Sequence, residues 1–160
     1  MTPLPRAADW LAATPPEALL RERAWLYPLV ETLHILGFVL LVGAVAMFDL
    51  RVLGLGRALP LRALGRYLLP WSVGGALLAL PTGALLFSTQ PADFLANPLF
   101  LLKLALIGAA ALNAALFHVG PWRGAGLDAG AAPPRARIQA ACSLLAWIAV
   151  IVCGRLLAYV

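Results

Sequence analysis

Four long apolar runs dominate this 160-residue sequence and leave few options for its fold. They cover about residues 25–50, 67–88, 98–119 and 138–160, and each reaches the roughly 20 residues that a helix needs to cross a bilayer core. The composition agrees, because 62% of the residues are hydrophobic and only 12% are charged. Soluble domains carry roughly 25% charged residues. The sequence therefore predicts an all-α, four-transmembrane-helix, up-and-down bundle.

The remaining chain is too short to build a second hydrophobic core. Its longest polar pieces are residues 1–24 and the linker 120–137. We therefore expect an N-terminal interfacial segment, 1–24, and a four-helix transmembrane domain, 25–160. The run from Thr14 to Glu17 fits a capping box with proline at the first helical position, which predicts a short helix along the membrane surface.

The net charge of +5 reflects arginines beside the ends of the apolar runs, so it does not indicate a nucleic-acid-binding face. Only Arg6, Arg21 and Arg23 precede the first run. The side reached after the first and third runs carries Arg51, Arg57, Arg62, Arg66, Arg123, Arg135 and Arg137. The positive-inside rule then places that side in the cytoplasm and both termini outside. We expect the lipid bilayer, and no nucleic acid, as a partner.

The first apolar run carries a carboxylate and an imidazole three residues apart. Glu31 and His34 share a helix face, and ionisable groups inside a membrane segment point to function. On a helical wheel, Glu31, Phe38 and Asp49 fall on one stripe, which we expect to face other helices because a carboxylate facing lipid is costly. Asp49 and Arg51 mark the cytoplasmic end of this run.

Charged residues from three runs fall at one depth. At 1.5 Å per residue, Glu31, Lys103 and Arg155 each lie about 7 to 9 Å below the outer interface, with His34 one turn deeper. These four residues predict an outward-facing polar pocket, and a paired ion network that fixes helix order is the structural alternative. Asn113 lies deeper in the third run, where an amide typically makes an interhelical hydrogen bond.

The histidines raise the possibility of a haem or metal site. His34 lies about 13 Å and His118 about 30 Å from the outer face, so one haem iron cannot bind both within one protomer. Met47 matches His118 in depth, which leaves a His/Met site open. Cys142 and Cys153 are about 16 Å apart along one helix and cannot form a disulfide. For copper these ligands form no spaced motif.

Several stretches resemble known membrane families. The segment WLYPLVETLHILGFVLLVGAVAMFDLRVLGLG, the Pro-Trp pair of the second run and LKLALIGAAALNA in the third resemble a family of small bacterial four-helix membrane proteins of unknown function. More distantly, LH-x-x-GF and the KLAL and asparagine of the third run are similar to the membrane domain of copper-resistance D (CopD) proteins. That resemblance implies copper uptake across a bacterial inner membrane, and it matches His34, Lys103 and Asn113. CopD proteins have more spans than this chain.

The sequence favours a non-enzymatic role, since no nucleophile is placed beside a base. We expect binding or passage of a small ion, metal or solute, with Glu31 as proton or cation acceptor and His34 as titrating or metal-ligating group. Lys103 and Arg155 would be the counter-ions. Two alternatives stay open: a b-type haem electron-transfer subunit with His34 or His118 as axial ligand, and a structural anchor for a partner protein. Four helices are few for a transporter, which favours a homodimer or larger membrane complex.

Overall fold

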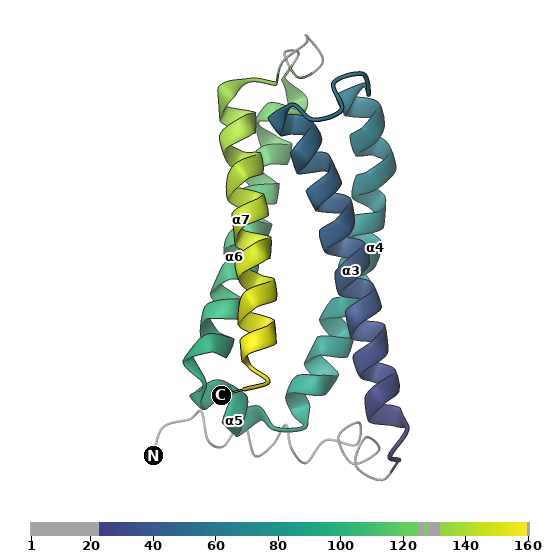
Figure 1. Ribbon diagram of the computed structural model, residues 1–160, viewed down its shortest axis with the longest axis vertical. Coiled ribbons are helices and arrows are strands. Elements are labelled where there is room, and N and C mark those ends of the chain that lie inside the picture. The colour runs from purple at the N-terminus through teal and green to yellow at the C-terminus, as the bar shows by residue number, and fades with distance from the viewer. Residues whose placement is uncertain (1–22, 125–126, 128–131, 160) are drawn as a thin grey trace.

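The computed structural model describes residues 23–124, 127 and 132–159 as a helical bundle (Figure 1). Its elements in chain order are α3 (Leu26–Leu53), α4 (Leu61–Ser88), α5 (Pro91–Ala96), α6 (Pro98–Val119), the 3-10 turn η1 (Pro121–Arg123) and α7 (Pro134–Leu156). Neighbouring long helices run in opposite directions. The predicted all-α, up-and-down four-helix bundle is confirmed, while the predicted N-terminal surface helix lies outside the described residues.

Four segments are long and apolar enough to cross a membrane. They are α3, α4, α7 and the stretch Pro98–Arg123, which contains α6 and η1. Many large aliphatic side chains point away from the bundle, as Leu77 does with 70% of its surface exposed. A surface of this kind suits lipid, and the chain is a multi-pass membrane protein by these measures.

Two helices begin earlier than the apolar runs predict. The second long helix starts at Leu61 and the fourth at Pro134. The first turns of each carry arginines, so these turns lie before the apolar run in the sequence. The connection between α3 and α4 is correspondingly short. It turns at Gly54, whose φ of 116° is a left-handed conformation that closes the C-terminus of α3 through hydrogen bonds to the carbonyls of Leu50 and Arg51.

The first two long helices form a hairpin in which their backbones touch. A Cβ atom on Gly75 of α4 would lie 2.5 Å from the backbone nitrogen of Leu41 and 2.6 Å from the carbonyl oxygen of Gly37, both on α3. Small residues allow such close approach in membrane helices. The ridge of Gly75, Ala79 and Gly83 therefore packs α4 against α3.

The other two long helices form a second hairpin. Asn113 Nδ2 of α6 donates a hydrogen bond of 2.9 Å to the backbone carbonyl of Gln139 on α7, the interhelical bond that is typical of a membrane amide. The hairpins meet where α3 packs along α7, for example through the edge-to-face rings of Phe38 and Trp147 at 6.1 Å. Helices α4 and α6 do not pack along one another.

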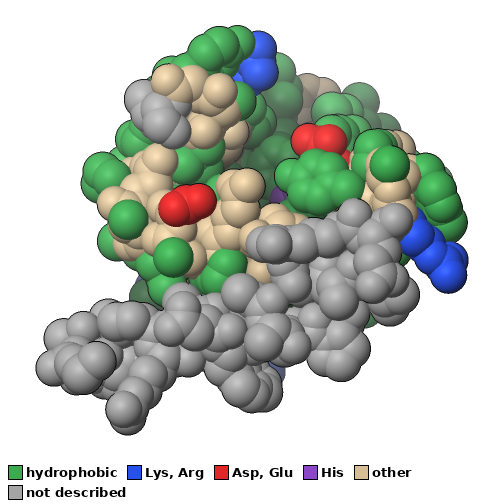
Figure 2. Space-filling view, turned by 90° about the horizontal axis from the view of Figure 1, so that it is seen from below, with side chains coloured by type: hydrophobic (Ala, Val, Ile, Leu, Met, Phe, Trp, Pro, Cys, Tyr) green, Lys and Arg blue, Asp and Glu red, His purple; other side chains and the backbone are tan. Residues whose placement is uncertain are grey.

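The two ends of the bundle differ in packing. At the loop end, where residues 54–60, 120–124 and 132–133 lie, a buried cluster joins all four long helices. Its members are Phe48, Val52, Leu61, Phe117, Leu127, Ala132, Ala136 and Ala140. At the open end, where α3 and α6 begin and α5 lies, the hairpins diverge (Figure 1). Figure 2 looks onto the open end and shows a recess between the hairpins, walled mainly by hydrophobic side chains.

Candidate functional site

His34 is the best-positioned polar side chain in the open half of the bundle. Its Nδ1 atom lies 2.9 Å from the carbonyl oxygen of Ala79 and 3.3 Å from the hydroxyl of Thr82, both on α4. A carbonyl oxygen can only accept, so Nδ1 carries the proton and its N–H donates a hydrogen bond to the Ala79 carbonyl. The neutral ring therefore keeps its lone pair on Nε2.

The neighbouring residues of α4 fix the imidazole. The Thr82 hydroxyl donates to the carbonyl of Leu78 at 2.6 Å, so its oxygen is turned towards the ring as an acceptor. Gly83 leaves the space, because a Cβ there would lie only 2.8 Å from Cε1 of His34. Among the described residues, none hydrogen-bonds to Nε2. The ring is thus held on one side and available on the other.

Lys103 approaches the same region from α6. Its half-buried side chain lies against α7, where a Cβ on Gly154 would be 3.7 Å from Nζ. Lys103 lies near Cys153 of α7, and His34 lies within electrostatic range of both Lys103 and Glu31. Across the described ranges, no carboxylate pairs with the Lys103 ammonium group. Within the described residues, one cation of a spanning segment therefore has no carboxylate partner.

The other two charges predicted for this pocket are placed differently. Glu31 is exposed, and no ion pair joins it to another described residue. Arg155 is also exposed; its guanidinium group donates to the Tyr159 hydroxyl and lies 4.8 Å from the centre of that ring. The structure thus brings Glu31, His34 and Lys103 into one region and turns Arg155 towards Tyr159. Among the described residues, no ion pair joins Glu31, Lys103 and Arg155, which the alternative of a paired ion network would require.

Asp49 and Arg51, predicted at the cytoplasmic end of the first span, are both buried at the loop end. Arg51 donates from Nε to the carbonyl of Leu59 at 2.7 Å and from Nη2 to the carbonyl of Arg57 at 3.3 Å, so it holds the α3–α4 connection in place. Asp49 faces α7 instead, where the Ser143 side chain lies close to its carboxyl group. The two side chains are adjacent in sequence but serve different neighbours.

The haem and metal candidates do not converge. His118 is exposed at the loop end, its Nδ1 donates to the carbonyl of Ala114 at 2.8 Å, and its ring lies 5.9 Å from that of Trp122. Met47 has 58% of its surface exposed. In the described part of the chain, no three His, Cys, Asp or Glu residues gather where a metal ion could bind. Cys142 and Cys153 are both free thiols.

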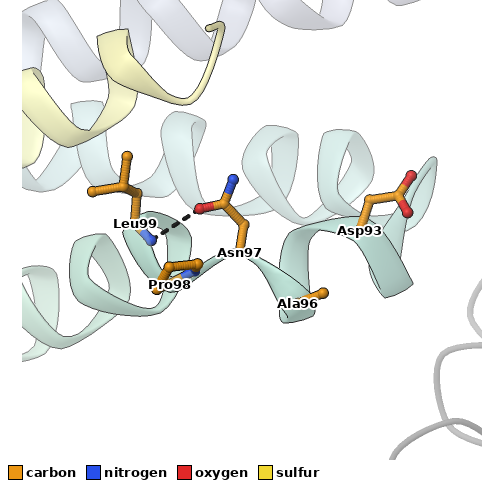
Figure 3. Close-up of a pocket in the computed structure, with 5 residues that line it drawn as sticks. All are labelled: Asp93, Ala96, Asn97, Pro98 and Leu99. Atoms are coloured by element: carbon orange, nitrogen blue, oxygen red, sulfur yellow. Dashed lines mark hydrogen bonds between the residues drawn. The ribbon is translucent and has the colours of Figure 1, made fainter. Parts of the chain in front are cut away.

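A second hollow, on the surface near the start of α6, has a structural explanation. This depression of about 550 Å³ is lined by Asp93, Ala96, Asn97, Pro98 and Leu99 (Figure 3). Its one side-chain hydrogen bond is the N-cap of α6, in which Asn97 Oδ1 accepts from the backbone N–H of Leu99 at 2.9 Å. The site follows from the turn between α5 and α6.

Sequence reasoning missed the residues of α4 and α7 that complete these sites. Ala79, Thr82 and Gly83 hold His34, and only their small size signalled close packing. Ser143, which lies near Asp49, carried no signal in the sequence. Comparison of the chain with protein-family models, with curated proteins and with solved structures found no match.

Proposed function

We propose that the protein binds the anion of a small weak acid between the two hairpins in the open half of the bundle. The observation that carries this proposal is the Lys103 ammonium group, which lies within a spanning segment without a carboxylate partner among the described residues. An unneutralised charge at membrane depth is costly and functional sites are the usual reason for it. An anion would supply the missing counter-charge.

His34 adds a proton acceptor to the same site. Its Nε2 lone pair is free while Nδ1 is held by Ala79, so the ring can accept the acid proton as Lys103 neutralises the anion. Glu31, exposed at the rim, would favour the uncharged acid over the bare anion during entry. This assignment keeps the expected binding of a small ion or solute, but it makes Lys103 the group that binds the anion and His34, in place of Glu31, the proton acceptor.

Titration calorimetry of the purified protein with acetate tests this proposal, with chloride as an ion that carries no proton. We expect wild type to bind acetate more tightly than chloride. Replacing Lys103 by Met should weaken acetate binding at least about tenfold, equivalent to about 1.4 kcal/mol. The matched control is Arg155→Met, which removes a cation on α7 that is engaged with Tyr159 and should leave binding unchanged. Equal affinity in Lys103→Met and wild type would overturn the proposal.

A haem or copper role is the second candidate, and one contact favours it. Histidines that bind metals typically donate their second ring N–H to a carbonyl or carboxylate, as His34 does to Ala79. His34 would then need a further ligand from a second copy of the chain, which agrees with a homodimer. A Soret band in the purified protein that His34→Leu removes and His118→Leu retains would establish haem and reject acid binding at Nε2.

We further propose that the loop end lies in the cytoplasm of a bacterial inner membrane and that both termini lie outside. Arginines on the loop-end connections and the adjoining helix turns support this orientation. A reporter enzyme that is active only outside the cytoplasm should work when fused after Val160 and fail when inserted at residues 54–60. The reverse pattern would overturn the orientation.

A further inference from the structure

Asp49 is a carboxyl group buried between α3 and α7. Its side chain is 6% exposed, and the Ser143 side chain of α7 lies within reach of its carboxyl group. The second carboxyl oxygen, Oδ2, is buried and has no hydrogen-bond partner. Burying an ionised carboxylate costs several kcal/mol unless a counter-charge and hydrogen bonds compensate.

No such counter-charge faces Asp49 from the described elements around it. Arg51, on the same helix, is bonded to the carbonyls of Leu59 and Arg57. The other titratable or charged groups near this level are exposed or engaged elsewhere: Arg62 and Arg66 of α4, His118 of α6, and Arg137 and Cys142 of α7. Arg62, for example, donates to the carbonyl of Gly124 and lies over the Trp122 ring. An ionised Asp49 would therefore be uncompensated.

Gln139 also carries a buried atom that lacks a hydrogen-bond partner. Its Oε1 is the other buried side-chain oxygen without a partner in the described part of the chain. Gln139 precedes Ser143 by four residues, so the two side chains share the face of α7 that meets Asp49. Both orphan atoms are hydrogen-bond acceptors, and a single proton on Asp49 would provide the donor that they lack.

We propose that Asp49 is a proton-binding site: a carboxylic acid in the membrane-embedded fold, whose O–H group is directed to Gln139 Oε1. A proton suits this site better than a hard cation such as Ca²⁺, which takes about six to eight oxygen ligands. The proton site shares no residue with the acid-binding site of His34 and Lys103. At about 1.5 Å per residue, it lies some 22 Å further along α3. Failure of either proposal leaves the other intact.

Infrared spectroscopy of the protein in lipid vesicles tests this assignment. At neutral pH, we expect wild type to show the C=O stretching band of one protonated carboxyl group, and Asp49→Asn to lack it. The matched control is Glu31→Gln, which removes an exposed carboxylate of the same helix and should keep the band. Gln139→Leu should move the band to higher frequency, because the acid loses its acceptor.

Asp49→Asn also keeps the test independent of folding. The amide can accept from Ser143 and donate to Gln139, so thermal stability should equal that of wild type, whereas Asp49→Leu should be less stable. Absence of the band in wild type, or its persistence in Asp49→Asn, would overturn the proposal. So would a carboxylate band of Asp49 that shifts when sodium is added, since that result would identify a cation site.

Discussion

The loop end and the open end of the bundle are built from the same four helices, but the loop end is packed more tightly than the open end (Figure 1). At the loop end, Phe48 contacts the rings of both Phe117 and Trp122, and small residues of α7 close the cluster. At the open end, the hairpins separate and polar groups such as His34 and Lys103 are only half buried. Packing at one end joins all four long helices, while at the other end a recess remains between the hairpins (Figure 2).

The largest loss of stability should come from removing a side chain of the buried cluster at the loop end. Replacing Phe48 by Ala removes a ring that is 3% exposed, and such cavities cost about 3–5 kcal/mol. The matched change at the open end is Phe100→Ala. Phe100 is partly exposed and stacks on Phe87 at 5.5 Å, so we expect a loss of about 0.5–1.5 kcal/mol. Free energies of unfolding in detergent micelles measure both, and equal losses would contradict the distinction between the ends.

The next largest loss of stability should come from disturbing the backbone contact between α3 and α4. Gly75→Val places side-chain atoms against the backbone of α3, and overpacking of this kind costs about 1–3 kcal/mol. Its control is the adjacent Gly74→Val, because a Cβ on Gly74 meets no atom within 4 Å. Denaturation midpoints of the two variants should differ clearly. Matching midpoints would show that the α3–α4 contact does not limit stability.

A smaller effect is expected in the second hairpin. Asn113→Leu removes the hydrogen bond to the Gln139 carbonyl, and interhelical hydrogen bonds in membranes contribute about 0.6 kcal/mol on average. Ala114→Leu is a control at an exposed neighbouring position. Thermal unfolding would detect a small decrease for Asn113→Leu alone. A loss as large as that of Phe48→Ala would mean that the second hairpin depends on this bond.

The smallest effect on stability should come from the open end itself. Lys103→Met removes a half-buried charge that has no carboxylate partner among the described residues, so the melting temperature should stay constant or rise. The same variant is expected to lose acetate binding. A marked fall in melting temperature would show that Lys103 contributes to packing, and it would contradict the distinction between the two ends.

The sequence predicted the four spans correctly because bilayer thickness and apolar length are directly linked. The helix starts at Leu61 and Pro134 were missed, since helical turns beyond the membrane core contain arginines and no longer appear apolar. The depth of Glu31, His34 and Lys103 also follows from counting residues, and they do fall in one region. Contacts across helices, such as His34 with Ala79, depend on helix rotation, which depth does not determine.

The stripe of Glu31, Phe38 and Asp49 illustrates the limit of a helical wheel. A wheel assigns one environment to a whole face, but here the neighbouring hairpin diverges along the helix. The stripe is therefore buried at Asp49, packed against Trp147 at Phe38 and exposed at Glu31. For the same reason Arg155 matched the others in depth but turned to Tyr159. Predicting these outcomes requires the angle between the hairpins.

The backbone contact between Gly37 and Gly75 has a mechanical consequence. With no side chain between them, α3 and α4 cannot slide or rotate independently without a clash, so the two helices form one rigid unit. Its attachment to the second hairpin runs along α7, and α4 and α6 remain apart. The width of the recess therefore depends on the angle at which α3 packs along α7, and the buried cluster at the loop end fixes that angle at one end.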